Sequence, residues 1–215
     1  MIDRPALPDE IRRGRIVAIG RGLSQDQALN VAAALVRGGI WAFEITLQTQ
    51  DSIASISAVS AAFAERGLLV GAGTVLTIDA ASRAVDAGAR FLVMPHTDPT
   101  LISWAATNRL VAIPGGLSPT EILVGWRAGA AAIKVFPASV AGLDLIRELQ
   151  GPLPDIPLIP TGGITAETAP AWFEAGALAV GVGSWLVGAG DAGVIEARAR
   201  ELVGAVGDRH VETVG

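Results

Sequence analysis

Lys134 is the only lysine of this 215-residue chain, whereas the other fifteen basic side chains of the Lys and Arg set are arginines. It lies in a mainly apolar segment, residues 129–137, with the length and bounding residues of a buried strand. A buried lysine amine can lose its proton and attack a carbonyl carbon, which an arginine cannot do. The sequence therefore indicates covalent imine chemistry at Lys134. The alternative is a lysine whose stem follows apolar surface while its ammonium group stays in water.

Glu44 lies in a second strand-like segment and could be the partner of Lys134. Side chains two positions apart share one face of a strand, so Lys134 shares its face with Ala132 and Phe136. The opposite faces of both segments are apolar and suit contact with helices. In a closed parallel barrel, Glu44 and Lys134 would then point into the same lumen. A carboxylate beside a buried amine is an acid/base partner for imine chemistry, or alternatively one half of a buried salt bridge.

Composition excludes several classes of protein. The chain is 51% hydrophobic with a mean hydropathy of +0.49, which is too apolar for disorder. Its net charge is −5, and its one basic cluster is Arg12, Arg13 and Arg15, so we predict no nucleic-acid partner. With no cysteine and no histidine–carboxylate cluster, we predict no metal site. No signal core or run of ~20 apolar residues occurs, so we predict a cytoplasmic protein without a membrane partner.

Strand-like and helix-like segments alternate along the whole chain. Helix-start signals include Ser24 with Gln27, Ser118 with Glu121, and Asp98 before a proline. Glycines recur where the helical patterns end, as expected of helix C-caps. The strand candidates are residues 16–20, 40–47, 68–74, 90–95, 110–114, 131–137, 157–161 and 179–184.

Eight such units predict an α/β fold, a (β/α)8 TIM barrel with a short N-terminal helix. The basic cluster would be the solvated end of that helix. A doubly wound sheet is the alternative, but the turn after the first strand lacks the full glycine fingerprint of that fold. No linker or shift of composition divides the chain, so we predict a single domain over residues 1–215.

Two glycine-containing loops could bind phosphate. Gly162 and Gly163 follow the seventh predicted strand, and Gly183 and Ser184 close the eighth. In (β/α)8 barrels the loops after these strands commonly form a phosphate site, because backbone N–H groups can approach an anion there. The alternative is a pair of tight turns. Arg21, at the end of the first strand, could grip a carboxylate with two hydrogen bonds or could simply be exposed.

Five motifs together resemble the 2-keto-3-deoxy-6-phosphogluconate (KDPG) aldolase family, and they occur in order from about Arg15 to the last strand. The resemblance implies a class I aldolase on a (β/α)8 barrel, usually a homotrimer, that needs neither a metal nor another cofactor. The motifs are Glu44-Ile-Thr-Leu, Gly71-Ala-Gly-Thr-Val75, Ile133-Lys-Val-Phe-Pro137, Pro160-Thr-Gly-Gly-Ile164 and Gly183-Ser-Trp-Leu186.

The resemblance also implies a role for each matching residue. Lys134 would form the Schiff base and Glu44 would be the general acid/base. The pyruvyl part of the substrate would lie against Thr74, Pro95 and Phe136. Its phosphate would be bound by Gly162, Gly163, Gly183 and Ser184, with Thr161 beside them.

Three positions depart from the family pattern and bear on the sugar. Gln48 stands where many members carry an arginine that engages the substrate carboxylate; glutamine cannot form that charge-assisted pair. Arg21 with Gly22 matches the phosphogalactonate-cleaving branch, and Ser139 replaces a frequent acidic residue.

We therefore predict cleavage of KDPG, a phosphorylated keto acid, to pyruvate and glyceraldehyde 3-phosphate. The same reaction on 2-keto-3-deoxy-6-phosphogalactonate is the nearest alternative. A phosphosugar isomerase or epimerase in which Lys134 acts only through its charge is a second alternative. A barrel that binds a small ligand without catalysis is the third.

Overall fold

Short apolar runs form parallel strands in the computed structural model, which describes residues 4–188 and 190–207. Each of the eight predicted segments contains a strand, so those predictions are confirmed. A further two-residue strand, β6, was not predicted, because two glycines give no side-chain alternation. The strands are β1 (Ile16–Gly20), β2 (Ala42–Thr46), β3 (Leu69–Gly73), β4 (Phe91–Val93), β5 (Val111–Ile113), β6 (Gly115–Gly116), β7 (Ile133–Val135), β8 (Leu158–Pro160) and β9 (Val180–Val182).

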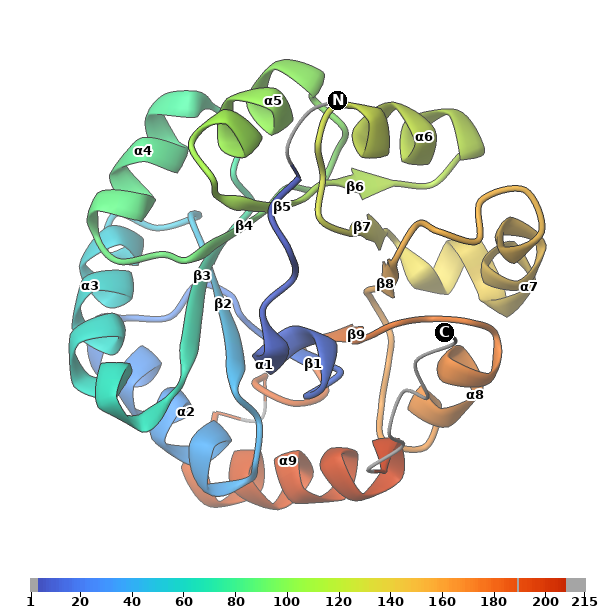
Figure 1. The fold of residues 1–215 in the computed structure, drawn as a ribbon. Coiled ribbons are helices and arrows are strands. Elements are labelled where there is room, and N and C mark those ends of the chain that lie inside the picture. The colour runs from blue at the N-terminus through green and yellow to red at the C-terminus, as the bar shows by residue number, and fades with distance from the viewer. Residues whose placement is uncertain (1–3, 189, 208–215) are drawn as a thin grey trace.

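The helices lie between the strands in sequence and form a ring around them (Figure 1). The predicted short N-terminal helix is confirmed as α1, which ends within the basic cluster. The helices are α1 (Asp9–Arg12), α2 (Gln25–Arg37), α3 (Ser52–Phe63), the 3-10 helix η1 (Ala64–Arg66), α4 (Ile78–Asp86), α5 (Pro99–Thr107), α6 (Pro119–Arg127), α7 (Ala138–Gln150), α8 (Ala169–Glu174) and α9 (Ala192–Val206). Among the described residues, no helix is long and apolar enough to cross a membrane.

The predicted helix-start signals act as caps. The side chains of Ser24 and Ser118 each accept a hydrogen bond from the third residue of the helix, and both form complete capping boxes. Asp98 accepts hydrogen bonds from two backbone N–H groups at the start of α5. Each cap satisfies N–H groups that the first helical turn leaves without a partner.

Four helices end on the glycines that the sequence pattern marks. Gly39, Gly88, Gly129 and Gly176 have φ values of 87°, 105°, 108° and 109°. This left-handed region is open to glycine because it has no Cβ. Each of these turns directs the chain from a helix back toward the start of the next strand.

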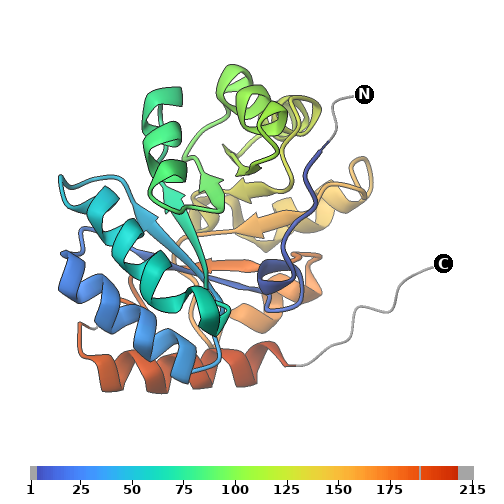
Figure 2. The same cartoon turned by 60° about the vertical axis from the view of Figure 1, so that its left-hand side comes forward.

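The strands pair in parallel and form two sheets. The larger is a curled six-stranded sheet with the order β5-β4-β3-β2-β1-β9, and the smaller has the order β6-β7-β8 (Figures 1 and 2). Strand pairing therefore gives a curled sheet and a smaller sheet beside it, rather than one continuous eight-stranded sheet. In register, Ile19 of β1 lies opposite Glu44 of β2, which in turn lies opposite Gly71 of β3.

Alternation along the strands produces two apolar cores. Phe43 and Ile45 of β2 and Ile133 and Val135 of β7 pack in the outer core with the helices. The other face of the strands packs in an interior core that Ile11 of α1 joins at the amino ends. That interior core contains Val17, Ala42, Phe91, Val93, Val111, Ile113, Ala131, Ala132, Ile159 and Ala179. The predicted division of faces is confirmed, and it directs Glu44 and Lys134 inward.

Candidate functional site

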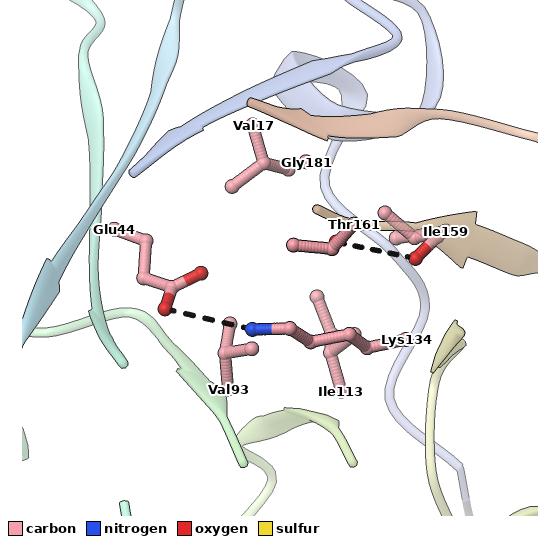
Figure 3. A pocket seen from close by; sticks show the side chains of 8 residues that line it. All are labelled: Val17, Glu44, Val93, Ile113, Lys134, Ile159, Thr161 and Gly181. Carbon is pink, nitrogen blue, oxygen red and sulfur yellow. Dashed lines mark hydrogen bonds and ion pairs between the residues drawn. The ribbon is translucent and has the colours of Figure 1, made fainter. Parts of the chain in front are cut away.

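Lys134 and Glu44 point toward each other inside the curled sheet (Figure 3). Lys134 lies in the middle of β7 and Glu44 in the middle of β2, so two rigid strands hold the pair. The Nζ atom of Lys134 lies 4.0 Å from Oε1 of Glu44, and the two side chains are only 9% and 2% exposed. The structure thus brings together the two groups that the sequence predicts as partners.

The walls around this pair are mostly apolar, and we call the space that they enclose the lysine cavity. Its other lining residues, which Figure 3 labels, come from five strands and from Thr161 directly after β8. Such walls lower the local dielectric constant and strengthen electrostatic interactions within the cavity. The lining residues are Val17, Glu44, Val93, Ile113, Lys134, Ile159, Thr161 and Gly181.

Burial dominates the electrostatics of Glu44. The loss of water raises the pKa of its carboxyl above the ordinary value, while the charges of Lys134 and Arg21 act in the opposite direction. A raised carboxyl pKa moves the group toward the pH range in which it can both give and take a proton. At 4.0 Å the pair is an electrostatic contact rather than a direct hydrogen bond.

Gly73 makes the position of the Glu44 carboxylate possible. A Cβ atom at Gly73 would overlap the Oε1, Cδ and Cγ atoms of Glu44. A Cβ at Gly71 would likewise overlap the ring of Phe91. From the sequence alone these glycines could be read as space for a substrate or as packing. At Gly73 the carboxylate of Glu44 occupies this space. The sequence analysis missed the contact because it joins residues of two different strands.

Phe136 lies beside the amine, with its ring centroid 5.1 Å from Nζ of Lys134. This distance is within the range of a cation–π interaction with the protonated amine. Thr74 is half-buried just after β3, with a φ of 57° that is uncommon for a β-branched residue. Pro95 is half-buried after β4. Within the described part of the chain, Thr74 and Pro95 line neither the lysine cavity nor the wider cleft beside it.

That wider cleft, here the carboxyl-end cleft, lies at the carboxyl ends of β1, β8 and β9. Thr161 lines both it and the lysine cavity, so the two spaces adjoin. Both predicted phosphate loops line this cleft, and so do Arg21 and Phe136. The predicted residues that line it are Arg21, Phe136, Thr161, Gly162, Gly163, Gly183 and Ser184.

The loops in this cleft present backbone groups suited to an anion. Gly162 and Gly163 have φ values of 110° and 78°, which a residue with a Cβ rarely adopts. Within the described residues, the backbone N–H groups of Gly162, Gly163 and Ser184 donate no hydrogen bond to the protein. Free N–H groups in a glycine-containing loop can bind a phosphate oxygen.

Arg21 and Gln48 have different environments. Arg21 is exposed at the end of β1, lines the carboxyl-end cleft, and its charge acts on Glu44. Gln48 is exposed beyond β2, where its Oε1 accepts a hydrogen bond from the hydroxyl of Thr46 at 3.3 Å. The structure therefore brings Arg21, but not Gln48, into the cleft. No group of three or more His, Asp or Glu side chains in the described ranges could hold a metal ion.

Comparison with protein families gives an independent result. The family model described as "KDPG and KHG aldolase" matches residues 7–203, which is most of the chain. Every residue of the lysine cavity and of the carboxyl-end cleft falls within this range.

Individual relatives agree with the family match. The chain is 38% identical over 200 residues to a probable 2-dehydro-3-deoxy-6-phosphogalactonate aldolase of Rhizobium meliloti, covering 92% of this chain and 93% of the relative. It is 33% identical to a 2-dehydro-3-deoxy-phosphogluconate aldolase of Pseudomonas aeruginosa, covering 89% of each. The solved KDPG aldolase of Zymomonas mobilis superposes with a TM-score of 0.84 at 30% identity, covering 92% of this chain and 96% of that one.

We predict that Gly73→Ala destabilises the protein by about 1–3 kcal/mol, because the new methyl group overpacks the space of the Glu44 carboxylate. Gly204→Ala is the matched control, since a Cβ there meets nothing within 4 Å in the last turn of α9. The control should stabilise the protein by about 0.4–1 kcal/mol. Urea unfolding of the three proteins measures both effects, and equal stability of Gly73→Ala and wild type would contradict the assigned contact.

Proposed function

The chain belongs to the KDPG and KHG aldolase family, and from that premise we propose that it is a class I aldolase that cleaves KDPG to pyruvate and glyceraldehyde 3-phosphate. The observation that carries this proposal is the enclosed pair of Lys134 and Glu44, 4.0 Å apart, beside a cleft with free backbone donors. An amine, a proton carrier and an anion site are the three parts that an imine-forming phosphosugar aldolase requires.

The reaction begins with the neutral amine of Lys134, which attacks the C2 keto carbon of the substrate. A proton moves to the former keto oxygen, and the resulting carbinolamine loses water to form an iminium ion. Glu44 lies within reach of the amine and carries protons between nitrogen and oxygen, directly or through a water molecule. Its raised pKa suits both directions of transfer.

Cleavage follows because the iminium ion accepts electrons. The Glu44 carboxylate removes the proton of the C4 hydroxyl, and the C3–C4 bond breaks to release glyceraldehyde 3-phosphate. The bonding electrons form an enamine on the three-carbon fragment. Protonation of this enamine at C3 and addition of water at C2 release pyruvate and the free amine of Lys134. Apolar walls around the pair exclude bulk water during these steps.

The phosphate would be bound in the carboxyl-end cleft by the free N–H groups of Gly162, Gly163 and Ser184. Thr161 lines both this anion site and the lysine cavity, so it lies where the two spaces adjoin. Binding energy from the phosphate fixes the aldehyde half of the substrate while its other half reacts.

Four further residues are assigned here to substrate binding. Arg21 lines the cleft and its charge acts on Glu44, so we assign it to the binding of a substrate anion. Thr74 and Pro95 would contact the pyruvyl part as in the family pattern, and Gln48 would contact its carboxylate in place of the arginine that many members carry. Identity is higher to the phosphogalactonate relative, at 38%, than to the phosphogluconate relative, at 33%, so the galactonate substrate is the alternative.

We also propose that the two sheets form one closed (β/α)8 barrel and one domain over residues 1–215. The isolated bridge between Thr161 and Gly181 joins the smaller sheet to β9. On the other side of the smaller sheet, the N–H of Ala131, two residues before β7, donates to the carbonyl oxygen of Ala112 in β5 at 2.9 Å. These contacts lie where a closed barrel requires them.

The assembly and the location follow from the family resemblance and the sequence. We propose a homotrimer in the cytoplasm that uses no metal or organic cofactor, since the covalent chemistry resides on Lys134. Exposed apolar side chains such as Leu76, at 52%, and Ile78, at 38%, are available for contact between subunits.

The imine has a direct test. Incubation with pyruvate followed by borohydride reduction should add one three-carbon group per chain, measured by intact mass, and peptide mapping should place it on Lys134 rather than on the α-amine. Lys134→Arg should form no side-chain adduct and lose turnover while its fold is preserved. Turnover by Lys134→Arg, or turnover of wild type without an adduct, would favour the isomerase, epimerase or other non-covalent reaction.

Glu44→Gln should reduce kcat by roughly 10²–10⁴-fold with a much smaller change of KM, because the amide cannot carry protons. Single-turnover cleavage separates this effect from product release. Glu65→Gln is the charge-matched control, since Glu65 is exposed on η1. If the single-turnover rate of Glu44→Gln equalled that of the control, Glu44 would be a structural partner of Lys134 only.

The substrate is identified by comparing kcat/KM for KDPG and for its C4 epimer, the phosphogalactonate substrate. We expect the higher value for KDPG. Arg21→Gln should raise KM for the preferred substrate by roughly tenfold or more, as expected when a charged hydrogen bond is lost. A higher kcat/KM for the epimer would assign the chain to the alternative reaction without affecting the imine.

A further inference from the structure

A second cleft, here the amino-end cleft, lies at the opposite ends of the strands. The N-terminal segment passes across β5 before it reaches α1 (Figure 1). Arg4, Glu10, Arg90 and Arg109 line the cleft that this crossing encloses, together with apolar residues that include Leu69 and Leu110. The cleft shares no lining residue with the carboxyl-end cleft or the lysine cavity.

Two exposed arginines that line this cleft, Arg90 and Arg109, have no ion-pair partner among the described residues. Arg90 directly precedes β4, and Arg109 lies two residues before β5, while Phe91 and Val111 of these neighbouring strands are paired in register. Neither guanidinium group makes an ion pair or hydrogen bond with any residue in the described ranges. Two positive charges that line one cleft make its electrostatic potential favourable for an anion.

Arg4 already has partners, so it forms a wall of the cleft rather than a free cation. Its side chain donates hydrogen bonds to the carbonyl oxygens of Ala130 and Trp126 at 2.7 and 2.8 Å, and it stacks 3.2 Å from the centroid of the Trp126 ring. Glu10 contributes one negative charge to the lining but forms no ion pair among the described residues. The charges of the lining therefore favour an anionic ligand.

The backbone at Arg109 supplies a second, independent observation. Arg109 has a φ of 57°, in the left-handed region that four other helices close with glycine. Its N–H donates to Ala106 and that of Leu110 donates to Ala105, which is the same pair of bonds that Gly88 and Ala89 form after α4. A glycine would fit this position without steric cost. The chain instead has an arginine there, and that choice places a guanidinium in the cleft.

We propose that the amino-end cleft binds a small anion of the phosphate class, inorganic phosphate or a phosphate monoester, between Arg90 and Arg109. Guanidinium groups form paired, charge-assisted hydrogen bonds with phosphate oxygens. Apolar residues of the lining, which include Leu69 and Leu110, can contact the carbon part of a monoester. This site is separate from the phosphate-binding loops at the carboxyl ends of the strands.

Inorganic phosphate is the probe for a test by NMR, with sodium chloride at matched ionic strength as the reference titration. Resolved backbone amide signals separate the two clefts, because each cleft has its own residues. We expect saturable shifts of the amides of Arg90, Leu110 and Val111 that chloride does not reproduce. These shifts should occur in addition to those of Gly162 and Gly163 at the carboxyl-end loops.

Variants of the two arginines complete the test. Arg109→Gly relieves the left-handed backbone and should unfold at a higher temperature than wild type in phosphate-free buffer, while the phosphate-dependent shifts of the amino-end cleft disappear. Arg90→Gln should weaken phosphate binding there at least tenfold. Arg147→Gln, an exposed position on α7 paired with Asp144, is the charge-matched control and should leave those shifts unchanged.

The proposal is overturned if phosphate shifts only the amides of the carboxyl-end loops. It is also overturned if chloride produces the same shifts at Arg90 and Val111, or if both arginine variants retain them. None of these outcomes depends on catalysis.

Discussion

The rest of the structure depends on the burial of one amine and one carboxyl group in an apolar interior. Removing two ionisable groups from water is unfavourable, and only their mutual attraction and a precise geometry offset that loss. Lys134 and Glu44 satisfy this condition from the middle of two strands, at 4.0 Å. Most of the surrounding interior is filled by aliphatic and aromatic side chains, so the ionisable groups that line the lysine cavity are this one pair. The reactivity of the lumen follows from that concentration.

The fold holds the Lys134–Glu44 pair and the loops proposed to bind phosphate in two separate but adjacent spaces. The reacting pair lies at mid-strand, whereas the free N–H groups lie in loops beyond β8 and β9. Thr161 forms part of both walls, so the proposed substrate can extend from one space into the other past this residue. The loops can vary in sequence without disturbing the cavity, because the strands rather than the loops determine its shape.

Features set by local sequence were predictable. Strand positions, the caps at Ser24 and Ser118 and the inward direction of Lys134 all follow from periodicity and hydrogen bonding within a few residues. β6 was not predictable, because paired glycines carry no alternating pattern. The contact between Gly73 and Glu44 was missed because it depends on strand register. The amino-end cleft was missed because its arginines are far apart in the chain, and Thr74, Pro95 and Gln48 were assigned only through family resemblance.

The contact between Gly73 and Glu44 has a consequence for sequence change over evolutionary time. The side chain of one strand occupies the volume that a Cβ on the next strand would need, so the two positions cannot vary independently. A larger residue at position 73 becomes tolerable only after the side chain at position 44 has become shorter or has moved, and either change displaces the carboxyl group from its present place. A duplicated copy of this gene that no longer needs proton transfer is therefore free to fill the lumen, while a copy that keeps the chemistry must keep both residues together.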